Sequence, residues 1–479
     1  MSFRITAFKK KLYAARPKPA GPPAVVETQR TKIRVRQEPC DPQTLERGVR
    51  QLFADKVSGS LVGIWLLVPE HLRLGTWDLL RGWSQQSGDR VEPRLALQLV
   101  HEAALCVSGV RQSRALPQKG FEVASGLPFV ASDQAIHDLL GSHTVAQAQE
   151  LQVALGRLRR AGGDFRGKLL AIDPHRLRSY SKRQMVRRKD KEESRPFKSA
   201  QTFFCIDADT SQPIAFTLGS SSRTLAQATP ELLALTENIL GPASGSPLVL
   251  ADSEHVSIDL FEHVLRQTPF DLIAPQPQRQ SLAKQFACLD PDAFTRRWAG
   301  FSTASRPFHF QHCETPFHQI VQRCGERDDD YRYKAFLATC PGDEVENLTL
   351  HYPKRWHAEE FFNTDQDLGW RRAGTLNLNI RYGRMTMALL AQASLHALRR
   401  RLGPPFQSWT SKHFAERFLA GLDGDLRVDD DTLFVTFYNA PNTERLRQHY
   451  ENLPAKLASQ GVDPRIPWLF DFKLDFRFR

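Results

Sequence analysis

The sequence lacks the long apolar run that marks a membrane-spanning segment. No hydrophobic stretch approaches the ~20 residues that a helix needs to cross a bilayer, and no signal peptide with an apolar core is present. The 7 cysteines are odd in number and widely scattered, which argues against a disulfide framework and favours a reducing compartment. These absences predict a cytoplasmic protein that has no membrane partner.

Acidic residues are almost missing from residues 1–38, which are rich in Lys, Arg and Pro. A segment of this composition is either a flexible basic arm that contacts phosphates or a terminus without such a role. An organelle transit peptide is a further reading of the same composition, but the proline cluster at 17–23 opposes the amphipathic helix that such a peptide needs.

Positive charge dominates the rest of the chain as well. The 479 residues carry 65 Lys and Arg against 53 Asp and Glu, a formal net charge of +12. A globular protein this basic most simply has a polyanion as its partner, and nucleic acid is the first candidate. Charge kept only for solubility is the alternative. The length allows two or three domains.

Residues 41–160 read as mostly helical, because apolar residues recur there at helical spacing. Three tryptophans in this part are predicted to be core residues rather than a base-stacking platform. No helix-turn-helix pattern is apparent. The predicted helices are Pro42–Lys56, Pro93–Val107 and Ser132–Leu158, with Ser132 as a start signal, and the tryptophans are Trp65, Trp77 and Trp83.

The pattern changes between residues 165 and 275, where short apolar runs alternate with helical segments. This order predicts an α/β domain whose sheet begins antiparallel and continues with parallel strands. The predicted strands are Lys168–Asp173, Gln201–Ile206, Pro213–Leu218, Leu248–Asp252 and Asp271–Pro275, and the predicted helices are Pro230–Leu240 and Val256–Leu265.

Two aspartates close apolar runs in this region. Asp173 ends Lys168–Asp173 and Asp252 ends Leu248–Asp252, so both carboxylates are predicted at the ends of neighbouring strands. Asp207 and Asp209 compete with Asp173 as the first carboxylate of a site. They precede a predicted hairpin turn, where aspartate is common and the Asp207 side chain should face solvent, so Asp173 is favoured.

A third carboxylate follows downstream, in the stretch from Leu348 to Phe362. Tyr352 is predicted to be extended and Pro353 to begin a helix, which puts Arg355 and Glu359 on one helix face. Such a pair can be a plain surface ion pair. Two strand-end aspartates with a helical glutamate are also what a two-metal phosphoryl-transfer site needs.

Tyr352, Arg355 and Glu359 follow the Y-x2-R-x3-E core of the signature of IS4-type DDE transposases, which the region from about 165 to 400 resembles. The family pattern continues with a lysine where this chain has Gln366. It also has an arginine after the second aspartate, where this chain has Ser253 before Glu254. Those family members are bacterial cut-and-paste enzymes.

The resemblance implies an α/β fold with a ribonuclease H-like catalytic core and a β-rich insertion, preceded by a helical domain that binds the element ends. The expected parts are a basic arm at 1–38, the helical domain at 39–160, the catalytic domain at 165–403 with its insertion at 276–350, and a C-terminal α+β module at 404–479 with a possible dimer or DNA contact. The last module has no assigned role.

The resemblance also implies a site. Asp173 would bridge two Mg²⁺ or Mn²⁺ ions, with Asp252 on one and Glu359 on the other. Arg355 and the Tyr352 hydroxyl would contact phosphates. Arg187 and Arg188 are further DNA-binding candidates in the basic stretch 175–198, which either contacts phosphates or is a plain solvated loop. Trp298 is another candidate: it would either hold a flipped base or pack in a core.

The implied function is DNA transposition: metal-dependent cleavage at the ends of an insertion sequence, then transfer of the 3′-OH ends into target DNA. The partners would be double-stranded DNA, both terminal inverted repeats and target, and a second copy of the chain, near the bacterial nucleoid. Two alternatives stay open. One is a non-catalytic DNA-binding descendant, favoured by Gln366 and Ser253, and the other is a ribonuclease H-like nuclease that only cuts.

Overall fold

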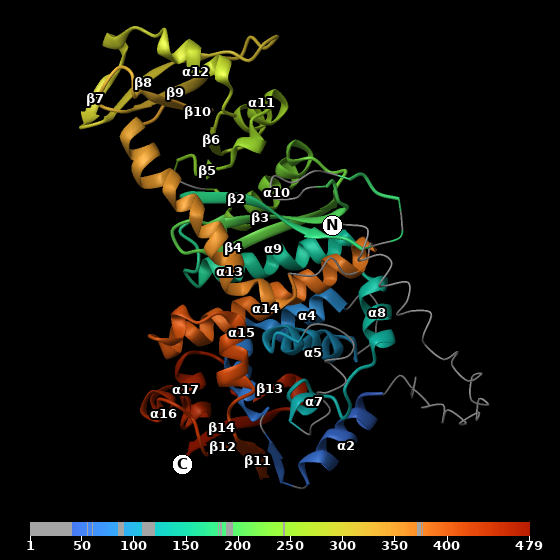
Figure 1. Cartoon of the computed structure of the whole chain (residues 1–479). Helices are drawn as coiled ribbons and strands as arrows, with labels where there is room; N and C mark the ends of the chain where they lie inside the picture. The colour runs from blue at the N-terminus through green and yellow to red at the C-terminus, as the bar shows by residue number, and fades with distance from the viewer. Residues whose placement is uncertain are drawn as a thin grey trace, which may run out of the picture. The chain divides into compact units, whose positions relative to one another are not determined.

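Two mixed β-sheets, with helices on and between them, make up the α/β fold (Figure 1). All described residues belong to one compact unit, Cys40–Arg479. The basic arm at 1–38 and Arg188 lie outside the described residues, so those two predictions are not addressed by the structure. The computed structural model describes residues 41–54, 56–59, 61–84, 91–107, 120–180, 182, 184–187, 195–242, 245–370, 375 and 377–479.

The larger sheet has nine strands, in the order β4-β3-β2-β5-β6-β10-β9-β8-β7. β2, β3 and β4 pair antiparallel, and β5 and β6 join β2 in parallel, as the sequence predicts. The strands of this half are β2 (Leu169–Arg178), β3 (Ser199–Asp207), β4 (Gln212–Ser220), β5 (Leu248–Leu250) and β6 (Asp271–Pro275).

The segment 276–350 extends this same sheet. β10 pairs antiparallel with β6, and β9, β8 and β7 follow as an antiparallel meander. A short helix packs beside them, around a small apolar cluster of its own. The elements are α12 (Gln280–Ala287), β7 (Thr295–Trp298), β8 (Phe301–Phe308), β9 (Phe317–Cys324) and β10 (Arg332–Ala338).

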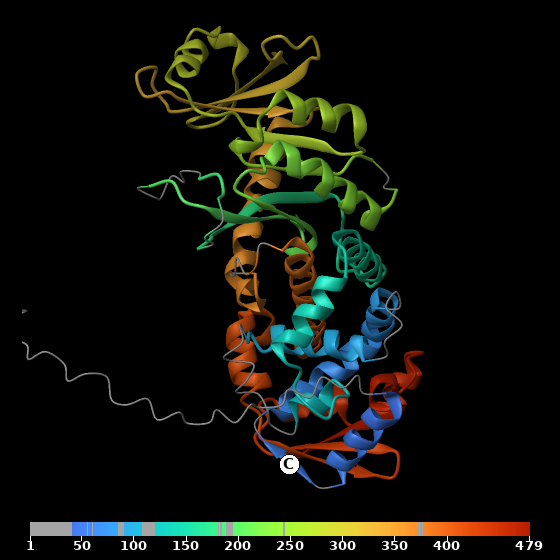
Figure 2. The same cartoon turned by 90° about the vertical axis from the view of Figure 1, so that its right-hand side faces the viewer.

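The two faces of the larger sheet are covered by different helices, as Figure 2 shows. Alternate strand residues enter two apolar clusters: Leu170 and Ile172 of β2 join the cluster under α10 (Leu225–Leu240) and α11 (Ile258–Gln267). Leu169 and Ala171 join the other cluster, which holds α13 (His357–Asp365) and α14 (Leu378–Leu402). This alternation is the period of two expected for a strand buried on both faces.

The helix α14 lies between the two sheets in Figure 1 and is buried along most of its length. It packs against β4 and against the helices of the N-terminal half. It ends at Gly403, whose φ of 67° is positive and is adopted readily by glycine, which has no Cβ. The N-terminal helices are α2 (Pro42–Phe53), α3 (Val68–Leu74), α4 (Thr76–Ser84), α5 (Glu92–Ala104), α7 (Phe121–Ala124), α8 (Asp133–Ser142) and α9 (Val145–Ala161).

The smaller sheet joins the two ends of the described chain. Its order is β1-β11-β12-β14-β13, and β1 (Val57–Gly59) pairs antiparallel with β11. A strand from the N-terminal part of the chain thus forms the edge of a sheet whose other strands come from the C-terminal part. The remaining elements are β11 (Gly424–Asp429), β12 (Thr432–Phe437), α15 (Ser411–Phe414), α16 (Thr443–Tyr450), α17 (Leu453–Ser459), β13 (Arg465–Ile466) and β14 (Phe472–Phe478). The predicted split into separate modules stays a prediction.

Several element boundaries differ from the predictions. The predicted helix Ser132–Leu158 is two helices, because Thr144 caps a second one with a capping box. Ser132 does cap the first.

Trp65, Trp77 and Trp83 are buried, which confirms them as core residues. None of the helices in the described part of the chain is long and apolar enough to cross a bilayer.

Candidate active site

Asp173 and Asp252 lie on the same face of the larger sheet. β2 and β5 are adjacent and parallel, and their register ends with Ala171 opposite Leu250. Continued for two residues past the end of β5, the same register would set Asp173 level with Asp252. Leu250 belongs to the apolar cluster of Ala171. By the strand period of two, both aspartates therefore lie on the face that α13 covers.

The prediction that Asp173 ends its strand was wrong. β2 continues to Arg178, because the antiparallel ladder with β3 runs on until Arg178 pairs with Ser199. Asp173 is therefore in mid-strand, opposite Phe204. Asp252 does follow the end of β5, where its side chain caps a short 3₁₀ turn, Ser253–His255. The backbone of the first carboxylate is thus held by the antiparallel ladder with β3, and the second carboxylate is held by a turn.

The third carboxylate, Glu359, lies on a helical run that passes β2. The run is helical from Glu346 onward: a π-helix Glu346–His351, a 3₁₀-helix Tyr352–Trp356 and then α13. The prediction of an extended Tyr352 and a helix beginning at Pro353 was wrong, since Tyr352 has φ −59° and ψ −36°. Pro353 falls where the π-helix gives way to a 3₁₀-helix, and such departures from the α-helical hydrogen-bond ladder are where proline is tolerated.

Arg355 connects the helix to the strand. Its Nη2 donates to Glu359 Oε1 at 3.1 Å, which confirms the predicted pair on one helix face. Its Nη1 donates to Asp173 Oδ1 at 3.3 Å. Burial lowers the pKa of Arg355, but Asp173, Tyr352 and Glu359 outweigh it and hold that pKa above its ordinary value. A permanent cation therefore stands between two carboxylates.

The electrostatic surroundings of Asp173 include the other two candidate carboxylates. Burial raises the pKa of Asp173 to about 7; Arg355 opposes this shift, and the negative charges of Asp252 and Glu359 reinforce it. Only 19% of its side-chain surface is exposed. Two like charges thus act on Asp173, opposed by Arg355 and His255, and further positive charge would stabilise its ionised form.

Asp252 is held by its own turn. Its Oδ1 accepts from the Glu254 backbone N–H at 2.9 Å and from His255 Nδ1 at 2.8 Å. Burial raises the pKa of Asp252, but the hydrogen bonds from His255 and Glu254 outweigh it, so the pKa lies below its ordinary value. Asp252 is therefore ionised at neutral pH and oriented before any ligand arrives. His255 is a site residue that the sequence analysis missed.

The residue types fit a hard divalent cation, which prefers carboxylate oxygens. Arg355 already acts as a stand-in cation between two of them. In the arrangement observed across the described ranges, no three His, Cys, Asp or Glu side chains are gathered closely enough to hold a metal ion. Asp173 and Glu359 both bind the Arg355 guanidinium. A metal ion bound to these two carboxylates would therefore replace the guanidinium as their counter-charge.

Asp207 was predicted to face solvent, and this was wrong. Its side chain is fully buried and accepts hydrogen bonds from the backbone N–H groups of Gly167, Asp209 and Thr210. A carboxylate at a tight turn is stabilised when it satisfies buried backbone donors, so Asp207 builds the β3–β4 turn. Its oxygens are already occupied in that role, which favours Asp173 over Asp207 as the first carboxylate of the candidate site.

The same turn anchors the Glu359 helix, which sequence reasoning did not foresee. Lys354 Nζ pairs with Asp209 Oδ1 at 2.7 Å, and His357 Nδ1 contacts the carbonyl oxygen of Ala208. These two contacts flank Arg355 in sequence and hold the helical run against the sheet. The basic residues Lys354 and His357 on either side of Arg355 were the only local sign of these contacts. Their partners, Asp209 and Ala208, lie more than a hundred residues away in sequence, so the contacts could not be predicted.

The remaining predicted contact residues have distinct surroundings. The Tyr352 hydroxyl donates to the Ala251 carbonyl oxygen at 3.1 Å, beside Asp252, and burial raises its pKa to about 12. Arg187 is exposed. Trp298 is 47% exposed on β7 and stacks on Phe301 with ring centroids 4.0 Å apart, so the alternative of a core tryptophan is wrong.

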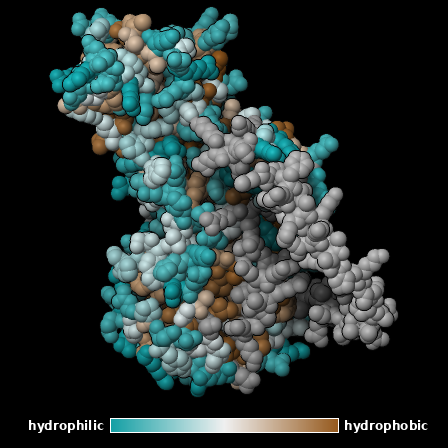
Figure 3. Space-filling view, viewed as in Figure 1, coloured by the Kyte–Doolittle hydropathy of each residue, from teal (hydrophilic) through white to brown (hydrophobic). Residues whose placement is uncertain are grey.

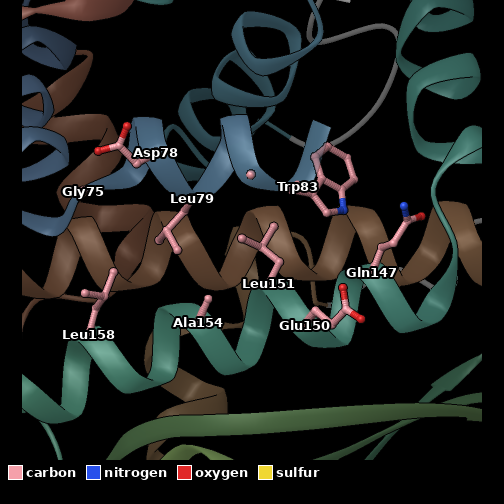
Figure 4. A pocket seen from close by; sticks show the side chains of 10 residues that line it. Gly75, Asp78, Leu79, Trp83, Gln147, Glu150, Leu151, Ala154 and Leu158 are labelled. Carbon is pink, nitrogen blue, oxygen red and sulfur yellow. The ribbon is translucent and has the colours of Figure 1, made fainter. Parts of the chain in front are cut away.

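A cavity of about 450 Å³ lies elsewhere, between α4 and α9 (Figure 4). Leu79, Leu151 and Ala154 face it, and Asp78 and Glu150 stand at its margin. None of the candidate site residues lines it. Phosphoryl transfer needs several hard oxygen ligands in reach of the reacting phosphate, and this largely apolar cavity does not offer them. This cavity is therefore not part of the candidate active site.

Comparison with known proteins adds no family assignment. No protein-family model matches the chain, and no curated protein is significantly similar to it. Among solved structures, a piggyBac transposase synaptic complex with hairpin DNA superposes with a TM-score of 0.39 and 12% sequence identity, over 76% of this chain and 82% of that chain. At this TM-score the superposition bears on neither fold nor function.

Proposed function

We propose that the chain is a DNA transposase that cleaves DNA at the ends of a mobile element and joins the freed 3′-OH ends to target DNA. One observation carries the proposal: Arg355 bridges Asp173 on a strand and Glu359 on a helix, and Asp252, just after the adjacent parallel strand, acts electrostatically on the same Asp173. An isolated surface ion pair would not be expected to place a third carboxylate on the next strand.

The sheet order supports a ribonuclease H-like core in this proposal. Three antiparallel strands are followed by two parallel ones, in the order β4-β3-β2-β5-β6. The β-rich stretch 276–350 then lies between the second and third carboxylates, as the resemblance implies, although it extends the core sheet through β10 and β6. The Tyr352–Arg355–Glu359 spacing supports the IS4-type assignment, and Gln366 and Ser253 depart from it.

Asp173, Asp252 and Glu359 would hold two Mg²⁺ or Mn²⁺ ions. Bound there, such ions would activate a water and stabilise the leaving 3′ oxygen. The chain's own residues perform the orientation: the β2 ladder fixes Asp173, and His255 and a backbone N–H fix Asp252. Lys354 and His357 hold the helix that presents Glu359. A rigid support of this kind is what precise ligand geometry requires.

Double-stranded DNA is the proposed partner, both as element ends and as target. The net charge of +12 favours a polyanion. The face with β7–β10 and α13 is mostly hydrophilic in Figure 3, as a phosphate-contacting surface would be. Exposed Trp298 at the sheet edge offers a ring to a base, and Arg187 and Arg355 offer charge. A homodimer on DNA, in the bacterial cytoplasm, completes the proposal.

A non-catalytic DNA-binding protein is the second candidate. Gln366 and Ser253 replace a lysine and an arginine of the family pattern, and Arg355 already neutralises two of the carboxylates. Such a protein would bind the same DNA without cutting it. A nuclease that only cuts is a third reading, and it differs from the proposal in the joining step alone.

The test uses linear DNA carrying the genomic sequences that flank the gene, with Mg²⁺ and a supercoiled plasmid as target. The expected result is cleavage at the inverted repeats that bracket the gene and joining of the ends to the plasmid. Asp252→Asn should abolish both steps and leave DNA binding nearly intact. Binding without any cleavage by the wild type would support the non-catalytic alternative, and cleavage without joining would support the nuclease.

A further inference from the structure

Arg355 occupies the position between Asp173 and Glu359. Its two terminal nitrogens reach one oxygen of each carboxylate, at 3.3 and 3.1 Å. Its side chain is 18% exposed and Asp173 is 19% exposed, so both charges of that pair are largely removed from water. The guanidinium thus links β2 to the Glu359 helix, because each of its two terminal nitrogens binds a different carboxylate.

The balance of charge around Arg355 leaves the cluster with excess negative charge. Asp173 is surrounded by Arg355, Asp252, His255 and Glu359. One guanidinium pairs with two carboxylates, and the hydrogen bond of His255 is to Asp252, three residues before it. A cluster of three carboxylates with one permanent cation attracts another cation, which must then share the site with the guanidinium.

We propose that Arg355 is a built-in competitor for the metal: its guanidinium keeps Asp173 and Glu359 paired while the site is free of metal, and a divalent cation binds only by displacing it. The inference rests on the proposed function, because it needs a metal at these carboxylates. It assigns Arg355 as a positioning residue that sets metal affinity, in addition to any contact it makes with a phosphate.

Competition of this kind has a measurable consequence. A cation that replaces Arg355 must first break two charge-assisted hydrogen bonds, and this cost is subtracted from its binding free energy. Arg355→Gln removes the competing charge and keeps a polar, though shorter, side chain. We expect this variant to bind Mn²⁺ about tenfold more tightly than the wild type, a difference of about 1.4 kcal/mol.

Arg176→Gln is the matched control. Arg176 is on the same strand as Asp173, and it pairs with Glu254, outside the three carboxylates. This substitution also removes one positive charge near the site without opening the space between Asp173 and Glu359. A general electrostatic effect would raise the Mn²⁺ affinity of both variants alike, whereas direct competition raises it only in Arg355→Gln.

The experiment is a calorimetric titration of the full chain with Mn²⁺ alone, without DNA, for the wild type, Arg355→Gln, Arg355→Lys, Arg176→Gln and Asp252→Asn. The expected order of affinity is Arg355→Gln, then Arg355→Lys, then wild type equal to Arg176→Gln, then Asp252→Asn. Thermal unfolding of each variant confirms that it is folded; if Arg355→Gln is not, Arg355→Lys carries the comparison, because a lysine cannot bridge both carboxylates.

Two different failures can be told apart. Measurable Mn²⁺ binding by the wild type that is unchanged or weakened in both Arg355 variants overturns the competitor role and leaves the proposed function standing. If the wild type binds no Mn²⁺ and does not differ from Asp252→Asn, the metal site itself is refuted, and the inference that rests on it is refuted as well.

Discussion

Two clusters of arginine and carboxylate groups in this molecule differ in how their charges balance. Glu70 of α3 is 1% exposed and accepts from Arg73, Arg401 and Tyr450 at 2.9, 2.8 and 2.9 Å. Its second oxygen accepts from Arg401 at 3.0 Å. One buried carboxylate thus has two guanidinium partners and a phenol. At Asp173 the ratio is reversed, with one guanidinium for two carboxylates.

The difference separates a structural ion cluster from a candidate functional one. The Glu70 cluster ties α3 to α14 and α16, and its carboxylate has every oxygen hydrogen-bonded, so it has no need of a ligand. The Asp173 cluster is more open, with Glu359 35% exposed, and it has a deficit of positive charge. A group that stabilises a fold is satisfied by the fold, whereas a group that binds a ligand is left incomplete.

The largest expected effect concerns Glu359 and its neighbour on the same helix. Glu359→Gln should reduce DNA cleavage at least about a thousandfold, which corresponds to about 4 kcal/mol of activation free energy. The matched control is Glu360→Gln, since Glu360 is the next residue and is 57% exposed. Cleavage is followed on end-labelled DNA. Equal losses in the two variants would mean that this helix matters for structure and not for chemistry.

The second effect concerns the Glu70 cluster. Glu70→Gln leaves two guanidinium groups without their buried counter-charge, so we expect a loss of about 3–5 kcal/mol in the free energy of unfolding. The loss is measured by urea unfolding. Glu359→Gln should lose less than about 1 kcal/mol by the same measurement, because that pair is partly solvated. Similar losses in both variants would erase the distinction between the two clusters.

The Arg355–Glu359 pair was predictable from sequence, because a helix brings residues four apart onto one face. Asp173 and Asp252 were singled out because each closes a short apolar run. The face that they share could not be read locally, because it depends on the pairing of β2 with β5. Local pattern therefore selected the three candidate carboxylates, and the pairing of distant strands decided their arrangement.

What the sequence could not show depends on distant partners. The strand that contains Asp173 is longer than its apolar run, because β3 supplies hydrogen bonds as far as Arg178. Asp207 is buried because Gly167 and its own turn offer backbone donors, and nothing in the local pattern distinguishes it from an exposed turn aspartate. The exposure of Trp298 likewise follows from its place on an edge strand, which is decided by the whole sheet.

The third effect is a rise in the free energy of unfolding when the Asp173 carboxyl is removed, together with a loss of activity. Asp173→Asn removes a buried carboxyl whose pKa is raised to about 7, so the metal-free variant should be more stable than the wild type at pH 8 by about 1–2 kcal/mol. The folded state binds this proton more tightly than the unfolded chain does. The stabilising contribution of the carboxyl is therefore complete below about pH 4 and is lost as the pH rises through 7.

The measurement is thermal unfolding in chelator at pH 5 and pH 8. The variant should gain on the wild type between the two values, and Asp431→Asn serves as a control because that carboxylate is exposed and its pKa is lowered by the contact with Lys473. A wild type that is as stable relative to Asp173→Asn at pH 8 as at pH 5 would contradict the raised pKa.

The smallest effect concerns the contact that anchors the Glu359 helix. Lys354→Gln removes a partly exposed ion pair with Asp209, which should cost no more than about 1 kcal/mol of stability. Cleavage should fall several-fold, because a looser helix presents Glu359 less accurately. Lys412→Gln removes another lysine ion pair, with Glu416, and should change neither property. If Lys354→Gln behaves like this control, the β3–β4 turn does not position the helix.

The most direct test of the account is a crystal structure of the protein with Mn²⁺, in which anomalous scattering locates the metal. The account predicts anomalous peaks in contact with the carboxylates of Asp173, Asp252 and Glu359, and an Arg355 side chain that has left its position between Asp173 and Glu359. Saturating Mn²⁺ with no peak at these carboxylates, and with both Arg355 ion pairs intact, would contradict it.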